Sequence, residues 1–263
     1  MCSPFEMIRR PREPSLLREK RRAELIWRRA MFLVTLVCFS TMATPSEQAG
    51  SSGAPPISPL TNAPLKEIEP GIFELGKVRL NKTQKSLSFP ATLNMTQGLI
   101  EYALVSSTGK LHESLLQTEV EPYHIHLAAL LLGVKCAGAD PPEPAARPAP
   151  SPVVSGGKLS VWISWKSGGA QKRCRLESLI LNLQTKSPMS QGAWIYSGSR
   201  VVEGTFLAQR DGSLIAIIAD PDALVNNPRP GRENDEIWEV NSAKAPPSGT
   251  AVQITLQLAE EKE

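Results

Sequence analysis

The feature that most constrains the fold of this chain is a series of short runs of β-branched and other apolar residues, separated by residues that favour turns. Such runs are typical of the strands of a β-rich domain. Ser-Thr-Gly-Lys at 107–110 and Arg-Asp-Gly-Ser at 210–213 are predicted to form hairpin turns, the second because Asp-Gly accepts positive φ angles. The expected strands lie at 78–80, 86–89, 99–105, 112–118, 159–165, 174–183, 193–196, 204–209, 214–219 and 252–258.

One helix is predicted between the fourth and fifth of these strands. Pro122 suits the first turn of a helix, residues 125–132 are apolar nearly all round, and Gly133 can end the helix in the left-handed conformation. A helix of this kind is expected to be buried against a sheet. A shorter helical turn is predicted at 222–225. The alternation of polar and apolar residues at 252–258 predicts a closing strand with one face in solvent. The fold class is therefore α+β, a mainly antiparallel β-sheet domain with one buried helix.

The first 43 residues have the order of a signal peptide. Residues 1–30 carry nine Lys or Arg against four Glu, and the apolar run at 30–43 follows them. This run is shorter than the roughly 20 residues that a membrane-spanning helix needs. Small residues at its end favour cleavage after Ala43, and an uncleaved membrane anchor is the alternative. The leader predicts an extracytoplasmic, for example periplasmic, location.

Two further segments are too poor in periodic apolar residues to form a core. Residues 44–70 are rich in Ser, Ala, Gly and Pro, which predicts a disordered linker. Residues 137–157 are Pro-rich and are interpreted as a long surface loop inside a single domain at 71–263. Beyond residue 30 the chain has 20 basic and 22 acidic residues, so no nucleic acid is expected as a partner.

The histidines are the clearest chemical signal. All three lie between residues 111 and 127, and Glu113 follows the first of them. Imidazole and carboxylate groups are ligands for transition metals, which makes His112, Glu113 and His124 candidate metal ligands. His124 and His126 would lie about 200° apart on a helix, so only one of them could join such a site. The alternative is that His112 and His124 connect a strand to the helix through hydrogen bonds.

The cysteines and aromatic residues allow further alternatives. Cys2 and Cys38 belong to the leader, so Cys136 and Cys174 remain for one disulfide or for two buried thiols. Trp162 and Trp165 fall on opposite faces of one expected strand, where aromatic side chains either bind sugars and peptides or fill a core. The sequence contains no G-x-S-x-G, Walker, G-x-G-x-x-G or H-E-x-x-H motif, so the familiar enzyme classes gain no support.

Five segments carry a resemblance to a known family: Lys-Leu-His-Glu-Ser-Leu at 110–115, Tyr-His-Ile-His at 123–126 with Ala-Leu-Leu-Leu-Gly at 129–133, Trp-Ile-Tyr-Ser-Gly-Ser-Arg at 194–200, Asp-Pro-Asp-Ala-Leu at 220–224 and Pro-Pro-Ser-Gly-Thr at 246–250. From residue 68 onward the chain resembles the YdjY-domain proteins of bacteria, especially the exported versions of planctomycetes. The resemblance implies a single domain of uncharacterised function. Some members carry cysteines for an iron-sulfur cluster. This chain lacks them, so no such cluster is expected.

Two functions follow from these observations. The first is a non-catalytic binding or structural module of the cell envelope, with an envelope protein or a glycan as partner, and with membrane contact if the leader stays attached. The second is a metal-binding or redox-associated protein that uses the histidine cluster. For the second function, the family resemblance also implies His112, Glu113 and His124 as the site.

Overall fold

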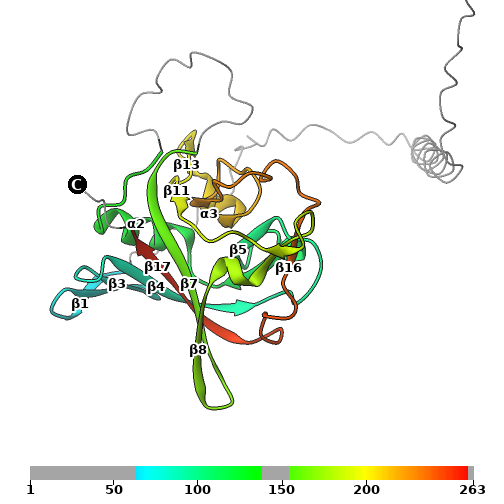
Figure 1. The fold of residues 1–263 in the computed structure, drawn as a ribbon. Helices are drawn as coiled ribbons and strands as arrows, with labels where there is room; N and C mark the ends of the chain where they lie inside the picture. Colours follow the sequence, from blue (N-terminus) through cyan, green and yellow to red (C-terminus); the bar gives the residue numbers. More distant parts are fainter. Residues whose placement is uncertain (1–62, 138–153, 260–263) are drawn as a thin grey trace, which may run out of the picture. The chain divides into compact units, whose positions relative to one another are not determined.

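The computed structural model describes residues 63–137 and 154–259 (Figure 1). All of them belong to the unit of residues 58–263. The predicted leader at 1–43, most of the predicted linker and most of the Pro-rich loop lie outside the described residues. In the described ranges, no helix is both long enough and apolar enough to cross a membrane.

Eight strands of the main sheet form a closed, barrel-like ring. Strand β4 closes the ring because it pairs with β17 on one side and with β6 on the other. Neighbours are antiparallel, except for the parallel pairs β14–β15 and β5–β6. In ring order the strands are β4 (Ser86–Leu93), β17 (Ala251–Leu258), β7 (Gly157–Ser167), β11 (Trp194–Tyr196), β15 (Val225–Asn226), β14 (Ser213–Ala216), β5 (Tyr102–Ser106) and β6 (Ser114–Thr118).

Further strands extend this ring. Strands β3 (Val78–Asn81), β2 (Ile72–Leu75) and β1 (Leu65–Glu69) continue the sheet beyond β4, and β8 (Ala170–Arg175) pairs with β7. Two small sheets lie outside it, one of β10 (Ser187–Pro188), β9 (Ile180–Asn182) and β16 (Trp238–Val240), the other of β12 (Val201–Val202) and β13 (Thr205–Phe206). The predicted β-rich fold with few helices is thus confirmed, and closure of the sheet is an addition to it.

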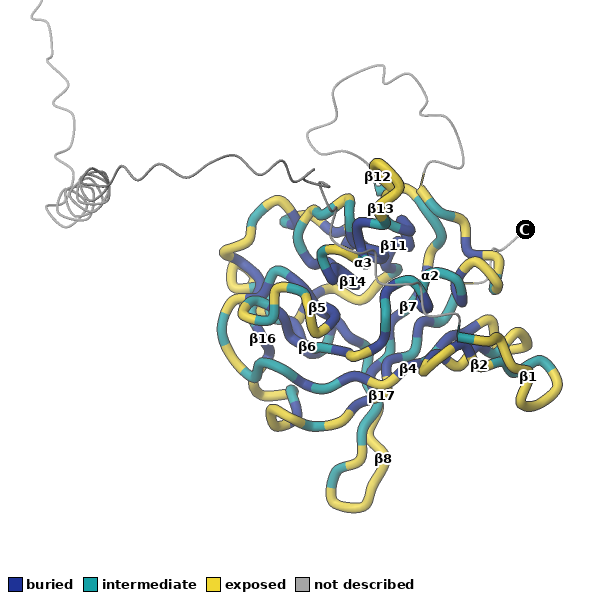
Figure 2. The backbone as a smooth tube through the Cα atoms, turned by 180° about the vertical axis from the view of Figure 1, so that it is seen from behind, coloured by how far each residue is buried: buried dark blue, intermediate teal, exposed yellow. Residues whose placement is uncertain are grey.

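The alternation at 252–258 behaves as predicted. On β17, Val252, Ile254 and Leu256 are buried in the core, while Gln253 is exposed. Ile254 lies opposite Phe89 of β4 and Ile163 of β7, and both of these side chains are buried as well. Each such aliphatic side chain contributes about 1.5–3 kcal/mol to folding when it leaves water. Figure 2 shows the same division, with buried residues along the strands of the ring and exposed residues at the projecting loops.

Helix α2 (Pro122–Leu131) begins at Pro122, as predicted, and Gly133 follows its end with a φ of +79°. One side of the helix packs against β3, β4 and the short helix α3 (Leu207–Asp211). The predicted burial against a sheet holds for this side of the helix, whereas Leu130 and Leu131 near its end are 44% and 46% exposed. The helix is apolar all round but is covered on one side.

A buried ion network lies next to the ring. Glu177, in the 3-10 turn η2 (Leu176–Leu179), is fully buried and accepts hydrogen bonds from Arg175 at 2.8 Å and from Arg229 at 2.9 Å. The guanidinium of Arg229 also lies 5.0 Å from the ring centroid of Trp194. Because Arg175 ends β8, this network fixes the base of the hairpin formed by β7 and β8.

Two predicted hairpin turns have other structures. Residues 107–110 do not form a hairpin, because β5 and β6 are parallel, and the 3-10 turn η1 (Leu111–Glu113) replaces the start of the predicted strand 112–118. Residues 210–213 end α3, where Gly212 has a φ of +72°. A left-handed glycine serves a helix end and a turn equally well, so the local signal does not separate them.

Four other predicted boundaries differ. Helix α3 takes up the end of the predicted strand 204–209, and η2 divides 174–183 between β8 and β9. The short helix predicted at 222–225 is a turn that leads into β15. The predicted linker 44–70 ends earlier than expected, because β1 begins at Leu65. All five side chains of β1 are exposed, so backbone pairing with β2 forms this strand without any apolar periodicity.

Candidate functional site

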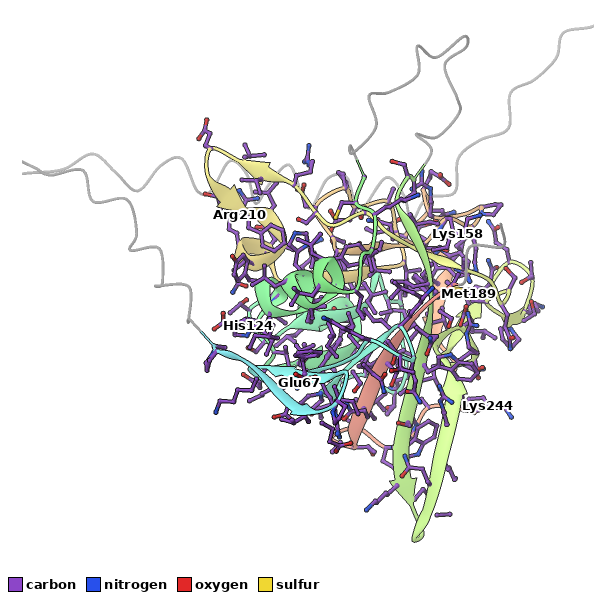
Figure 3. All side chains as sticks on the ribbon, turned by 90° about the vertical axis from the view of Figure 1, so that its left-hand side faces the viewer. Glu67, His124, Lys158, Met189, Arg210 and Lys244 are labelled. Carbon is purple, nitrogen blue, oxygen red and sulfur yellow. The ribbon has the colours of Figure 1, made fainter. Side chains whose placement is uncertain are left out.

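The predicted metal ligands occupy two environments. His112 lies in η1 with its side chain 80% exposed, and its Nε2 is 3.5 Å from Oε2 of Glu113. His124 lies on α2 (Figure 3) and is buried. Its imidazole faces Gly76, since a Cβ at Gly76 would lie 2.9 Å from Nδ1. Over residues 63–137 and 154–259, no three His, Cys, Asp or Glu side chains are grouped so that they could hold a metal ion.

The third histidine has a different neighbourhood. Nδ1 of His126 is 2.8 Å from the hydroxyl of Tyr196, and its ring centroid is 4.9 Å from that of Phe206. Burial lowers the pKa of His126 and raises the pKa of Cys136, which packs against Gly198. Cys136 and Cys174 are both free thiols, so the alternative of a disulfide between them is not seen, but both side chains are half-buried and not fully buried. Neutral forms of the imidazole and the thiol are favoured here.

Glu113 belongs to a polar cluster around Lys110. The ammonium of Lys110 is 2.9 Å from Glu113 and 3.3 Å from Glu101, and it lies 5.3 Å from the ring centroid of Tyr102. Burial, together with Glu113, raises the pKa of Glu101. Burial opposes the ionisation of Glu113 as well, but hydrogen bonds with Lys110 and Glu101 hold its pKa below the ordinary value. The ammonium group of Lys110 therefore forms ion pairs with both carboxylates.

The hydroxyl of Tyr102 connects this cluster to Asp220, to whose Oδ2 it donates a hydrogen bond of 3.1 Å. Burial and the charge of Asp220 raise the pKa of Tyr102 to about 12.

The raised pKa of Tyr102 predicts a loss of stability at high pH. Because the folded protein holds the phenolic proton more tightly than the unfolded chain does, the contribution of Tyr102 to stability is complete below pH 10 and is lost between pH 10 and about 12. In Tyr102→Phe we expect the tyrosinate absorbance titration to lose the component centred near pH 12. An unchanged titration would contradict this assignment.

The outer face of the sheet forms a separate polar surface. Strand register places Arg79, Ser88, Thr255, Trp162 and Arg175 in one row across β3, β4, β17, β7 and β8. Directly opposed residues of an antiparallel pair point to the same side, so these five side chains share one face. We call this surface the open sheet face. Its opposite side is the core that contains Phe89, Ile254 and Ile163.

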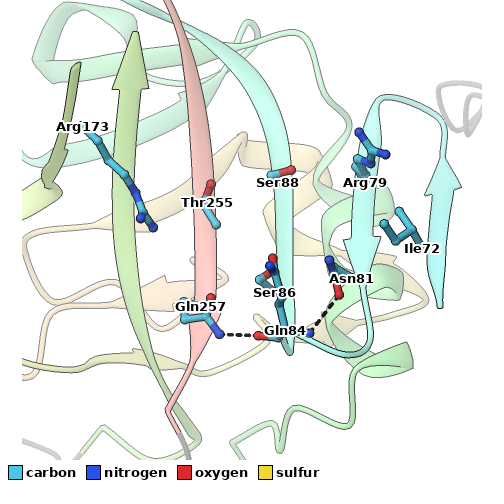
Figure 4. Close-up of a pocket in the computed structure, with 9 residues that line it drawn as sticks. All are labelled: Ile72, Arg79, Asn81, Gln84, Ser86, Ser88, Arg173, Thr255 and Gln257. Carbon is cyan, nitrogen blue, oxygen red and sulfur yellow. Dashed lines mark hydrogen bonds between the residues drawn. The ribbon is translucent and has the colours of Figure 1, made fainter. Parts of the chain in front are cut away.

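A groove of about 330 Å³ runs over the open sheet face (Figure 4). Arg79 and Arg173 supply two guanidinium groups to its lining, and Ile72 supplies the apolar part. None of the carboxylates in the described ranges lines it. The side-chain amide of Gln257 donates a hydrogen bond to the carbonyl oxygen of Gln84, and both residues line the groove (Figure 4). We call it the polar groove. Its neutral polar lining consists of Asn81, Gln84, Ser86, Ser88, Thr255 and Gln257.

Trp162 holds one of the guanidinium groups in place. The guanidinium carbon of Arg173 is 4.2 Å from the Trp162 ring centroid, and that of Arg175 is 5.4 Å from it. The register confirms that Trp162 and Trp165 lie on opposite faces of β7, since Trp162 pairs with Thr255 on the outer face. Trp194 is fully buried, so it belongs to the core. Sequence reasoning missed Arg79 and Arg173, although the absence of acidic residues at 157–175 was a usable signal.

Comparison with known proteins identifies the family to which this chain belongs. The model of the YdjY domain matches residues 78–257, from β3 to β17 and on both sides of the Pro-rich segment 137–157. The chain belongs to the YdjY domain family. This is a domain of unknown function, and the match includes all eight strands of the ring. No curated protein and no solved structure matches the chain.

Proposed function

We propose that this YdjY-domain protein is a non-catalytic binding module of the cell envelope, and that it holds a glycan in the polar groove. The observation that supports the proposal is the composition of the groove: six neutral hydrogen-bonding side chains and two guanidinium groups. The leader expected at 1–43 would deliver the module to the envelope.

The chemistry of the groove suits sugars. Hydroxyl groups of Ser and Thr and amides of Asn and Gln both donate and accept hydrogen bonds, as sugar hydroxyls do. Pockets for drug-like molecules are mostly apolar and enclosed, whereas this groove is polar and lies along several strands of a sheet. An extended chain of sugar units can follow such a surface and form one or two hydrogen bonds per unit.

The proposal is tested by removing hydroxyl groups from the middle of the groove. Ser88 and Thr255 lie directly opposite each other on β4 and β17. In the double variant Ser88→Ala/Thr255→Val we expect a rise of roughly tenfold in the dissociation constant, since two hydrogen bonds at about 0.5–1.5 kcal/mol each are lost. Isothermal titration against a panel of soluble polysaccharides, neutral and acidic, measures this change.

Thr92→Val provides the matched control. Thr92 lies on β4 as well, outside the lining of the groove, and its loss of a hydroxyl should leave the dissociation constant unchanged. Circular dichroism and thermal unfolding establish that the variants are folded. The proposal would be overturned if none of the polysaccharides in the panel binds, or if Thr92→Val raises the dissociation constant as much as Ser88→Ala/Thr255→Val does.

A further inference from the structure

We infer that the glycan is acidic, and that it contacts both sides of the hairpin formed by β7 and β8 as well as the polar groove. The inference rests on the proposed function and specifies its ligand. This hairpin comprises residues 157–175, and the end that carries its turn projects beyond the ring of strands (Figure 1). The hairpin contains no acidic residue. Its five basic residues are Lys158, Lys166, Lys172, Arg173 and Arg175.

The two sides of the hairpin both carry positive charge. Arg173 lies opposite Ser164 and belongs to the open sheet face, next to Trp162. Lys172 lies opposite Trp165, so these two side chains point to the other side. A ligand that crosses the edge strand β8 therefore meets a cation on each side of it.

A second groove, of about 410 Å³, lies on that other side. Trp165, Lys172 and Cys174 line it from the hairpin, and Lys244 lines it from the segment after β16. Arg173 lines this groove and the polar groove, which makes the two neighbours. As in the polar groove, the described residues contribute no carboxylate to its lining.

The cations around the grooves differ in whether the protein neutralises them. Arg175 is paired with Glu177, and Arg79 with Glu69. None of the ion pairs of the described residues involves Lys172, Arg173 or Lys244. Three like charges around two adjacent grooves produce a local positive potential that an acidic ligand relieves. The planar guanidinium of Arg173 suits a carboxylate or sulfate group, with which it can form two parallel hydrogen bonds.

A polysaccharide fits these grooves better than a nucleic acid does. Single-stranded nucleic acids bind largely through bases stacked on aromatic rings, but Arg173 and Arg175 lie over the ring of Trp162. The remaining lining consists mostly of hydroxyl and amide groups, which match sugar hydroxyls. The positive charge is also local, since the chain beyond residue 30 has a small acidic excess.

The test compares polygalacturonate with its methyl ester, which has the same backbone without the charges. By isothermal titration of the full chain at low salt, we expect the acidic form to bind at least tenfold more tightly, and its affinity to fall steeply as salt is added. Arg173→Gln should remove most of this preference. Lys172→Gln/Lys244→Gln, which leaves the polar groove intact, should weaken binding of the acidic form about fivefold and reduce its salt dependence.

The matched control is Lys66→Gln/Lys77→Gln, which removes the same charge from exposed positions outside both grooves and should change affinity less than twofold. If the two polymers bind equally tightly and Lys172→Gln/Lys244→Gln has no effect, the inference of an acidic ligand is refuted. Binding of a glycan in the polar groove is then still tested separately by Ser88→Ala/Thr255→Val. Tighter binding of duplex DNA than of polygalacturonate would refute the inference as well, because it would identify a nucleic-acid surface.

Discussion

Replacement of Glu177 by alanine is expected to lower the free energy of unfolding by about 3–5 kcal/mol. Glu177 is fully buried, and its carboxylate is the acceptor for both Arg175 and Arg229. Without it, the guanidinium of Arg229, itself 9% exposed, would remain in the interior with no compensating charge. Leaving an uncompensated charge in a protein interior is among the most costly single changes. Urea denaturation followed by tryptophan fluorescence measures the loss.

Glu69→Ala is the corresponding change in an exposed ion pair. The carboxylate of Glu69 is 3.3 Å from Arg79, and both side chains are about half exposed or more. Solvent screens such a pair, so we expect a change of less than about 1 kcal/mol. A loss below 1 kcal/mol for Glu177→Ala too would show that the network contributes no more than a surface pair does.

Gly212→Ala is expected to cost about 2–5 kcal/mol. Gly212 has a φ of +72°, which costs other residues about 1–2 kcal/mol. In addition, a Cβ at Gly212 would lie 2.7 Å from the backbone of Gly109, in the segment between β5 and β6. Relief of such an overlap shifts the backbone and adds about 1–3 kcal/mol. Urea denaturation followed by tryptophan fluorescence measures this loss of stability as well.

Gly133→Ala isolates the conformational part of this cost. Gly133 also follows a helix, with a φ of +79°, but a Cβ there would have no neighbour within 4 Å. We expect a loss of about 1–2 kcal/mol. If the two alanine variants lose the same stability, close approach to Gly109 has no energetic role and the left-handed conformation accounts for both.

The parts of the fold that the sequence predicts are those with a face in the core. Strands β17 and β7 alternate because one side meets apolar partners, and α2 is marked at its ends by Pro122 and Gly133. Strand β1 has every side chain in solvent, so no pattern distinguishes it from a linker. The parallel pairing of β5 with β6 depends on contacts between distant segments, such as Gly109 with Gly212, which local turn residues do not encode.

The candidate site was less predictable than the fold. The spacing of Trp162 and Trp165 alone predicts opposite faces, because side chains alternate between the two faces of a strand. The polar groove, in contrast, draws its lining from β2, β3, β4, β8 and β17, and only the strand order brings Arg79 and Arg173 to one surface. The three histidines are close in sequence, but the structure gives His112, His124 and His126 separate surroundings.

The position of β17 has a consequence for the order of folding. This strand is the last of the ring in sequence, yet it lies between β4 and β7 and pairs with residues 86–92 of the first and 159–164 of the second. Until it is synthesised, β4 and β7 each keep an open edge of unpaired backbone groups, the kind of edge at which chains aggregate. The ring also closes through contacts between distant segments, which slows folding. The ring of a nascent chain therefore stays open until residues 251–258 have left the ribosome.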